Sequence, residues 1–298
     1  MTSSLAASDR QTPDTLDIPG TWNARDVGGR AVPAGGRAPL RTGVLVRTAS
    51  LSRLTPEGVA ALAALGVTLD LDLRGEDEVE RDGQDVVPAT TRVVPRRMDP
   101  GVGVGHALGG SDEPAPTGTP GDEGAEDPAA EERSADTAAM IGRLLGAEDP
   151  QALARAMMHG VYATFVTDPT IRRTVGEALE DVAEAEGTVV VHCSAGKDRT
   201  GWIVALVQHV CGVGEEDRLA EYLASGAAVE GLSAVIPPIP GLDKDALTPL
   251  LGVEPEYLQG AWALAETEFG SVDGYLDACG AGPATRAKIA RKFAAQGV

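Results

Sequence analysis

The chain contains few cysteines and few aromatic residues for its length. Only three of its 298 residues are cysteine, and aromatic residues make up 3%. A disulfide framework needs more cysteines in regular spacings, and no CxxC pair or Cys/His cluster suggests zinc. We therefore expect reduced thiols, no metal and a core built mainly from alanine, valine and leucine.

Positive charge is also scarce, because 25 Lys and Arg residues face 45 Asp and Glu residues and the formal net charge is −20. Nucleic acids and anionic membrane surfaces are polyanions, so this charge argues against binding to either one. An anionic substrate would have to be held by a local positive site.

The sequence lacks segments that would insert into or cross a membrane. No uncharged apolar run reaches the ~18 residues that span a bilayer, so we expect no stable membrane insertion. The first 20 residues contain neither a basic n-region nor an apolar h-region. We expect a cytoplasmic protein and leave export without a cleaved signal peptide open. Nothing in the sequence indicates the oligomeric state.

Strands and helices alternate in the first third of the chain. Residues 43–47 (GVLVR) predict a short strand, and Thr55 followed by Pro56 predicts the start of a helix that Gly66 ends. Residues 67–74 alternate apolar and polar side chains, as a half-buried strand does. This order predicts an α/β fold with a central sheet flanked by helices.

One domain over residues 18–298 accounts for this pattern, preceded by a flexible leader over residues 1–17. Residues 101–135 interrupt it with a Gly- and Pro-rich acidic segment. Such a segment buries too little apolar area to offset its ordering entropy, so we predict a disordered insertion.

A strand and a helix are predicted to flank one short loop in the second half of the chain. Helical patterns cover residues 136–145, 151–166 and 168–187, and the β-branched run TVVV predicts a buried strand after them. Helical spacing resumes at Thr200. The loop HCSAGKDR, residues 192–199, thus joins a strand end to a helix start.

The chemistry of such a loop suits a phosphate group. Backbone N–H groups at a helix start bind a tetrahedral anion and also stabilise a thiolate at Cys193. Arg199 can offer its planar guanidinium to two phosphate oxygens. A Walker A loop is excluded, because that pattern needs a glycine at Val191 and a hydroxyl residue at Asp198.

The stretch HCSAGKDRTG resembles the signature loop of the cysteine-dependent tyrosine and dual-specificity phosphatases, in particular their bacterial HCxAGKDR group. The resemblance extends to WNARDVGG at 22–29, GVLVRTASLSRL at 43–54 and DLRGEDEVE at 72–80. It implies a tyrosine phosphatase-like fold and the hydrolysis of phosphomonoesters. The substrate class would be phosphorylated protein, with phosphoinositides as a further possibility.

The resemblance also implies roles for single residues. Cys193 would be the nucleophile, Arg199 would bind the phosphoryl group, and Thr200 would hydrogen-bond the sulfur. The remaining substrate-binding candidates are His192, Ser194, Ala195, Gly196, Lys197 and Arg47. Lys197 would add a cation at the rim, the feature that the resemblance connects with phosphoinositides.

Two aspartates compete for the role of general acid. Asp198 matches the aspartate of the family's KDR motif and is the favoured acid. Asp72 matches the aspartate of its DLR motif, and the alternative role for Asp72 is to brace the loop as a hydrogen-bonded carboxylate. Asn23, Arg25, Asp26 and Arg74 are expected to support the loop. No cofactor is expected, because the arginine and the amides neutralise the phosphoryl oxygens.

Other functions share parts of this pattern. A phospho-binding module without turnover would lack the cysteine, the arginine or the acid, and all three are present. A lipid or inositol phosphate phosphatase stays open. Arsenate reduction would require a resolving cysteine, and the only candidate, Cys211, lies on the far part of the following helix by spacing.

Overall fold

The computed structural model describes residues 15–29, 39–100, 138–226, 240–241 and 243–294. The predicted acidic insertion lies outside these residues, as does the predicted leader up to residue 14. Thr15, within the predicted leader, is described and forms an antiparallel bridge with Arg25.

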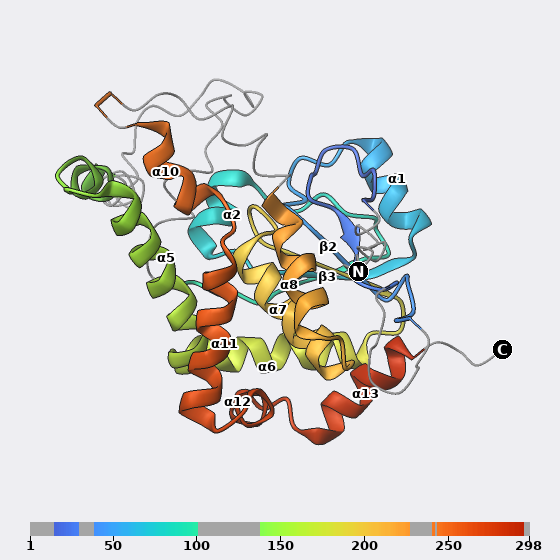
Figure 1. Cartoon of the computed structure of the whole chain (residues 1–298). Coiled ribbons are helices and arrows are strands. Elements are labelled where there is room, and N and C mark those ends of the chain that lie inside the picture. Colours follow the sequence, from blue (N-terminus) through green and yellow to red (C-terminus); the bar gives the residue numbers. More distant parts are fainter. Residues whose placement is uncertain (1–14, 30–38, 101–137, 227–239, 242, 295–298) are drawn as a thin grey trace, which may run out of the picture.

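Five strands form one mixed sheet in the order β1-β2-β5-β3-β4 (Figure 1). Their bounds are β1 (Arg25–Asp26), β2 (Leu45–Thr48), β3 (Val67–Asp72), β4 (Arg92–Pro95) and β5 (Thr188–His192). Strand β1 pairs antiparallel with β2, and the other neighbours are parallel. The predicted α/β fold is confirmed, with the TVVV run as the central strand.

The helices surround this sheet in the arrangement of Figure 1. They are α1 (Pro56–Ala64), α2 (Glu76–Asp82), α5 (Pro150–Thr167), α6 (Pro169–Glu184), α7 (Asp198–Val210), α8 (Glu215–Leu223), α10 (Lys244–Leu251), α11 (Pro255–Phe269), α12 (Val272–Cys279) and α13 (Pro283–Phe293). Residues 138–145 are helical as well. Within the described residues, no helix combines the length and apolar character of a membrane span.

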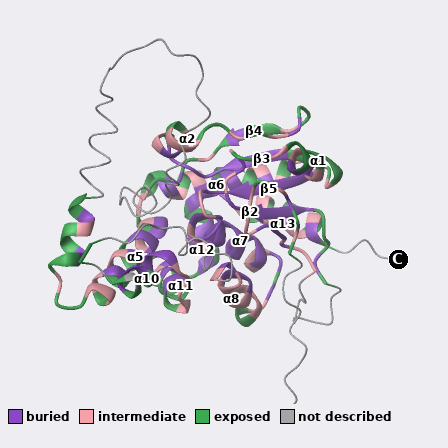
Figure 2. Cartoon of the chain, turned by 90° about the horizontal axis from the view of Figure 1, so that it is seen from above, coloured by how far each residue is buried: buried purple, intermediate pink, exposed green. Residues whose placement is uncertain are grey.

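Both faces of the sheet are buried, and Figure 2 shows its central strands in the interior. On β5, Val189 and Val191 belong to the larger core, whereas Val190 belongs to a smaller core beneath α1. The alternation follows from the two-residue period of a strand. Layers on both faces hold β5 rigidly, and β5 leads directly into the loop that contains Cys193.

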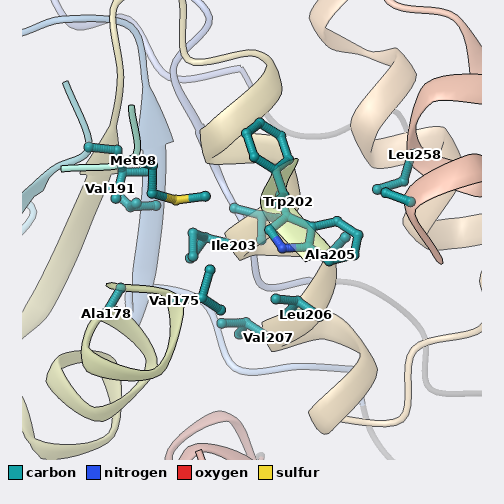
Figure 3. Packing of buried hydrophobic residues seen from close by; sticks show 14 of the residues in the cluster. Met98, Val175, Ala178, Val191, Trp202, Ile203, Ala205, Leu206, Val207 and Leu258 are labelled. Carbon is teal, nitrogen blue, oxygen red and sulfur yellow. The ribbon is translucent and has the colours of Figure 1, made fainter. Parts of the chain in front are cut away.

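Helix α7 is buried along nearly its whole length. Figure 3 shows Ile203 and Val207 beside Val175 of α6, and all three side chains are 0% exposed. Because large apolar side chains fix α7, its first turn has a defined position relative to the end of β5.

Candidate active site

The predicted loop lies between the carboxyl end of β5 and the first turn of α7. Cys193 follows β5 directly and is 3% exposed. Burial of the thiol would raise the pKa of Cys193, but the charge of Arg199 and the hydroxyl and backbone N–H of Thr200 together lower it. The site therefore favours a thiolate.

Carbonyl groups of the loop are bound from outside. Ser50 N donates to Ser194 O at 3.1 Å. Asn23 Nδ2 donates to Ala195 O at 3.1 Å and to Gly196 O at 2.9 Å. In a planar trans peptide the C=O and the next N–H point in opposite directions. Carbonyls that face outward therefore turn the following amides inward, as an anion cradle requires.

Two backbone positions make this geometry possible. Gly196 has φ of +62°, and a Cβ there would lie 2.2 Å from Thr48 O. Only glycine fits such a position. Asn23 has φ of +58° and is the one non-glycine residue with positive φ among those described. Its strained backbone aims the side-chain amide at the loop, which is consistent with a bracing role.

Arg199 is held by a carboxylate that our sequence reasoning did not assign. Its Nη1 and Nη2 lie 2.5 and 2.7 Å from the two carboxylate oxygens of Glu78 on α2. Burial would raise the pKa of Glu78, but Arg199, the Ser194 hydroxyl and Gly75 N–H hold it well below its usual range. Glu78 is thus an anion that fixes the guanidinium beside the loop.

A second buried carboxylate, Glu221 on α8, supports the loop from the other side. Arg25 Nε and Arg47 Nη1 each lie 2.7 Å from one of its oxygens. Arg47 also donates to Gly196 O. We expected Arg47 to face the substrate, but it is 0% exposed and lies behind the loop. Its contacts fit support of the loop, the role expected for Arg25.

The other support candidates lie farther from the loop. Asp26 accepts from Gly28 N and Gly43 N, both at 2.7 Å, and so fixes the chain near β1. Arg74 forms ion pairs of 2.8 Å with Asp72 and 2.9 Å with Asp85. Both carboxylate oxygens of Asp72 therefore accept hydrogen bonds from Arg74.

His192 lies beneath the loop in a buried polar cluster. Its Nε2 is 3.2 Å from both Asp70 and Asp85, and its Nδ1 is 3.2 Å from Cys193 O. Burial would lower the pKa of His192, but the two carboxylates raise it well above its ordinary value. A protonated ring donates from both nitrogens, so His192 can orient the loop through Cys193 O.

The same cluster contains ligand-type atoms of Asp70, Asp85 and His192 within 4.8 Å of one another. Arg74 and protonated His192 already provide cations to these carboxylates, and burial raises the pKa of Asp70. Charges of the protein itself thus compensate the carboxylates, although both oxygens of Asp70, Oδ1 of Asp85 and Nε2 of His192 have no hydrogen-bond partner of good geometry, and we assign no metal to them.

Asp198 and Lys197 occupy the start of α7. Tyr162 donates to Asp198 Oδ1 at 2.9 Å, and Lys197 Nζ lies 3.4 Å from Oδ2. The side chain of Asp198 is 22% exposed and that of Asp72 is 6% exposed. Asp198 is therefore the more accessible of the two candidate acids.

Lys197 differs from the expected rim cation. It is 4% exposed, and its Nζ donates to three carbonyls at the end of α10 and just beyond it, those of Leu250, Leu251 and Gly252, at 2.8, 3.0 and 2.9 Å. A lysine at a helix C-terminus satisfies otherwise unpaired carbonyls. In this structure Lys197 thus connects the loop to α10.

Apart from Asp70 and Asp85 beneath the loop, four residues of the site escaped sequence reasoning: Glu78, Tyr162, Glu221 and Tyr222, whose hydroxyl lies 2.7 Å from that of Tyr162. Glu78 falls within DLRGEDEVE, a motif that indicated this region without indicating which carboxylate pairs with Arg199. The other three lie on helices α5 and α8, where no local pattern distinguishes them from ordinary surface or core residues.

Comparison with known proteins agrees with this geometry. The model of the tyrosine phosphatase family matches residues 16–295. The triple specificity protein phosphatase PtpB of Mycobacterium tuberculosis is 33% identical over 294 residues, which cover 90% of this chain and 95% of that protein. A tyrosine-protein phosphatase of Nostoc commune is 28% identical over 186 residues, 62% of this chain and 49% of that protein.

Proposed function

The chain belongs to the tyrosine phosphatase family, and we propose that it hydrolyses phosphomonoesters in two steps through a phosphocysteine at Cys193. The observation that supports this most directly is the position of the thiol. Cys193 lies at the start of a loop whose carbonyls are bound outside it, with Arg199 and Thr200 close enough to lower the thiol pKa.

In the first step the Cys193 thiolate attacks phosphorus, and the bond from phosphorus to the ester oxygen breaks. Asp198 gives its proton to the leaving oxygen, so that an alcohol or phenol departs. The inward amides and Arg199 stabilise the charge on the phosphoryl oxygens. The hydrogen bonds of Arg199 to Glu78 use one edge of the guanidinium, and the phosphoryl group would take the Nε edge.

In the second step water attacks phosphorus and the bond from sulfur to phosphorus breaks. Asp198, now a carboxylate, accepts the proton of the water. The sulfur leaves as a thiolate, which the Thr200 hydroxyl and the charge of Arg199 stabilise. Inorganic phosphate is released and the thiolate is restored for the next cycle.

Phosphotyrosine is the substrate class we propose. The printed name of the M. tuberculosis relative describes triple specificity, which supports testing phosphoserine, phosphothreonine and phosphoinositides as well. The ammonium group of Lys197 donates to three carbonyls at the end of α10 in this structure, so nothing in its contacts favours phosphoinositides over phosphotyrosine.

Initial rates on matched phosphotyrosine, phosphoserine/threonine and phosphoinositide substrates, with a chelator present, test the proposal. We expect turnover of phosphotyrosine that the chelator does not change and that Cys193→Ser abolishes. Full activity of Cys193→Ser would refute the covalent route. Vanadate binding without turnover of any substrate would instead identify a phospho-binding module.

Asp198→Asn tests the acid. Its rate should fall much more with poor leaving groups than with good ones, because only poor ones require the proton. Asp72→Asn should change both rates equally, since Asp72 is bound to Arg74. The reverse pattern would transfer the acid role to Asp72.

A further inference from the structure

Two buried tyrosines form a hydrogen-bond chain that ends on Asp198. The hydroxyl of Tyr222 on α8 lies 2.7 Å from that of Tyr162 on α5, and Tyr162 donates to Asp198 Oδ1 at 2.9 Å. Tyr162 is 1% exposed and Tyr222 is 0% exposed. Neither residue was given a role in the two-step reaction described above.

The donor-to-acceptor direction of this hydrogen-bond chain is fixed. Tyr162 has one hydroxyl hydrogen, and it donates that hydrogen to Asp198 Oδ1. In the hydrogen bond between the two tyrosines, Tyr222 must therefore be the donor and Tyr162 the acceptor. Burial raises the pKa of both hydroxyls well above the ordinary value, and the nearby carboxylate of Asp198 raises it further. Both tyrosines therefore stay protonated at neutral pH and can act as donors.

This direction distinguishes the two oxygens of Asp198. Oδ1 is an acceptor for Tyr162 and is poorly placed to carry a proton of its own. Oδ2 lies 3.4 Å from Nζ of Lys197. That ammonium already donates to three backbone carbonyls, so it offers Oδ2 a charge but no remaining hydrogen. Oδ2 is thus the oxygen that can hold a transferable proton.

Packing fixes the two rings and hence their hydroxyls. The ring of Tyr162 lies 5.1 Å from that of Phe165 and 5.7 Å from that of Tyr257, measured between centroids. Tyr222 lies against the first turn of α7, where a Cβ at Gly201 would come within 2.9 Å of its ring. Glycine at position 201 therefore lets Tyr222 reach Tyr162.

We propose that Tyr162, held by Tyr222, is a positioning residue for proton transfer: it occupies Oδ1 of Asp198 and so directs the acidic proton to Oδ2. This inference rests on the proposed function, in which Asp198 is the general acid. It predicts that removing one hydroxyl, 36 residues away in sequence, damages only the proton-transfer part of catalysis.

The test compares Tyr162→Phe with the unchanged protein on a series of aryl phosphates whose phenols differ in acidity. We expect kcat to fall on the order of tenfold with the poorest leaving group, the effect of one hydrogen bond to a charged group. With the best leaving group kcat should change less than about twofold, because that phenolate departs without a proton. The solvent isotope effect with the poor leaving group should change as well.

Matched controls separate positioning from simple loss of packing. Tyr222→Phe should give the same leaving-group pattern with a smaller loss, and it serves as the second probe if Tyr162→Phe folds poorly. Tyr275→Phe removes another buried hydroxyl, which donates to Phe165 O at 2.8 Å and does not belong to the Tyr222–Tyr162–Asp198 hydrogen-bond chain. Any loss of kcat in this variant should be the same for all leaving groups.

Two results would overturn the inference: equal losses of Tyr162→Phe on all esters, or the same leaving-group pattern in Tyr275→Phe. Asp198→Asn, measured in the same series, identifies which idea has failed. If Asp198→Asn depends on the leaving group and Tyr162→Phe does not, only the inference about Tyr162 is wrong. If Asp198→Asn shows no dependence, the assignment of the acid fails and the inference fails with it.

Discussion

Replacing Glu78 by glutamine should remove much of the activity, because Glu78 holds Arg199 and also accepts a hydrogen bond from the Ser194 hydroxyl of the loop. Glu78 holds Arg199 through two hydrogen bonds of 2.5 and 2.7 Å, and its side chain is 3% exposed. Glutamine keeps one acceptor but turns an NH₂ group toward the guanidinium. The loss of one charge-assisted bond in a buried pair is worth about 2–3 kcal/mol. If Arg199 is displaced to that extent, kcat/KM falls about 30- to 150-fold.

The assay is the initial rate on a phosphotyrosine peptide, together with circular dichroism to show that the variant is folded. Glu76→Gln provides the matched control, because Glu76 begins the same helix and pairs with Arg97 at the surface, 66% and 49% exposed. Surface ion pairs contribute little, so this variant should keep its activity. A loss below about threefold in Glu78→Gln, or an equal loss in both variants, would refute the reasoning.

The same substitution has a pH signature. Arg199 and two further donors hold the pKa of Glu78 well below its usual range despite the opposing effect of burial. A lowered folded-state pKa stabilises the protein above the unfolded value of about 4.3, and this stabilisation is lost as the pH falls through the folded value. The difference in unfolding free energy between the wild type and Glu78→Gln should therefore shrink from about pH 6 to about pH 3. Urea titrations that give a constant difference would contradict this.

Three further outcomes follow from the geometry of the loop. Cys193→Ser should lose turnover but still bind vanadate in a calorimetric titration. Gly196→Ala should lower the melting temperature and reduce kcat at least tenfold, because its Cβ would meet Thr48 O at 2.2 Å. The strain at this position is on the order of 1–3 kcal/mol. Iodoacetate near neutral pH should alkylate Cys193 and neither of the other two cysteines, since burial raises the pKa of Cys211 and Cys279 to about 12. Mass spectrometry of the digested protein identifies the alkylated cysteine.

Local signals in the sequence predicted much of the fold. The Thr55 side chain accepts from Gly58 N at the start of α1, and Gly66 follows that helix with φ of +69°, as expected. Asp168 caps α6 in the same way. Caps and strand periodicity act over a few residues, so a sequence displays them directly. The loop from Cys193 to Arg199 was predictable for the same reason, because its amides, thiol and arginine are neighbours in the chain.

Partners that are distant in sequence were not predictable. Glu78 lies 121 positions from Arg199, and Glu221 lies 174 positions from Arg47. An isolated arginine shows no preference between a substrate and a buried carboxylate until the fold brings one of them within reach. This is why Arg47 was expected to face the substrate, although Glu221 holds it behind the loop.

A chain with a net charge of −20 can bind a phosphoryl group because the site does not depend on excess positive charge. Arg199 is paired with Glu78, and the supporting Arg25 and Arg47 share the one carboxylate of Glu221, so these three buried cations face two carboxylates. What the pairs supply is direction, since a guanidinium that is fixed by one edge presents its other edge to a single point. The inward amides add dipoles that need no counter-ion. Preorganised donors of this kind stabilise developing charge more effectively than mobile surface lysines, because they need no reorganisation when the reaction occurs.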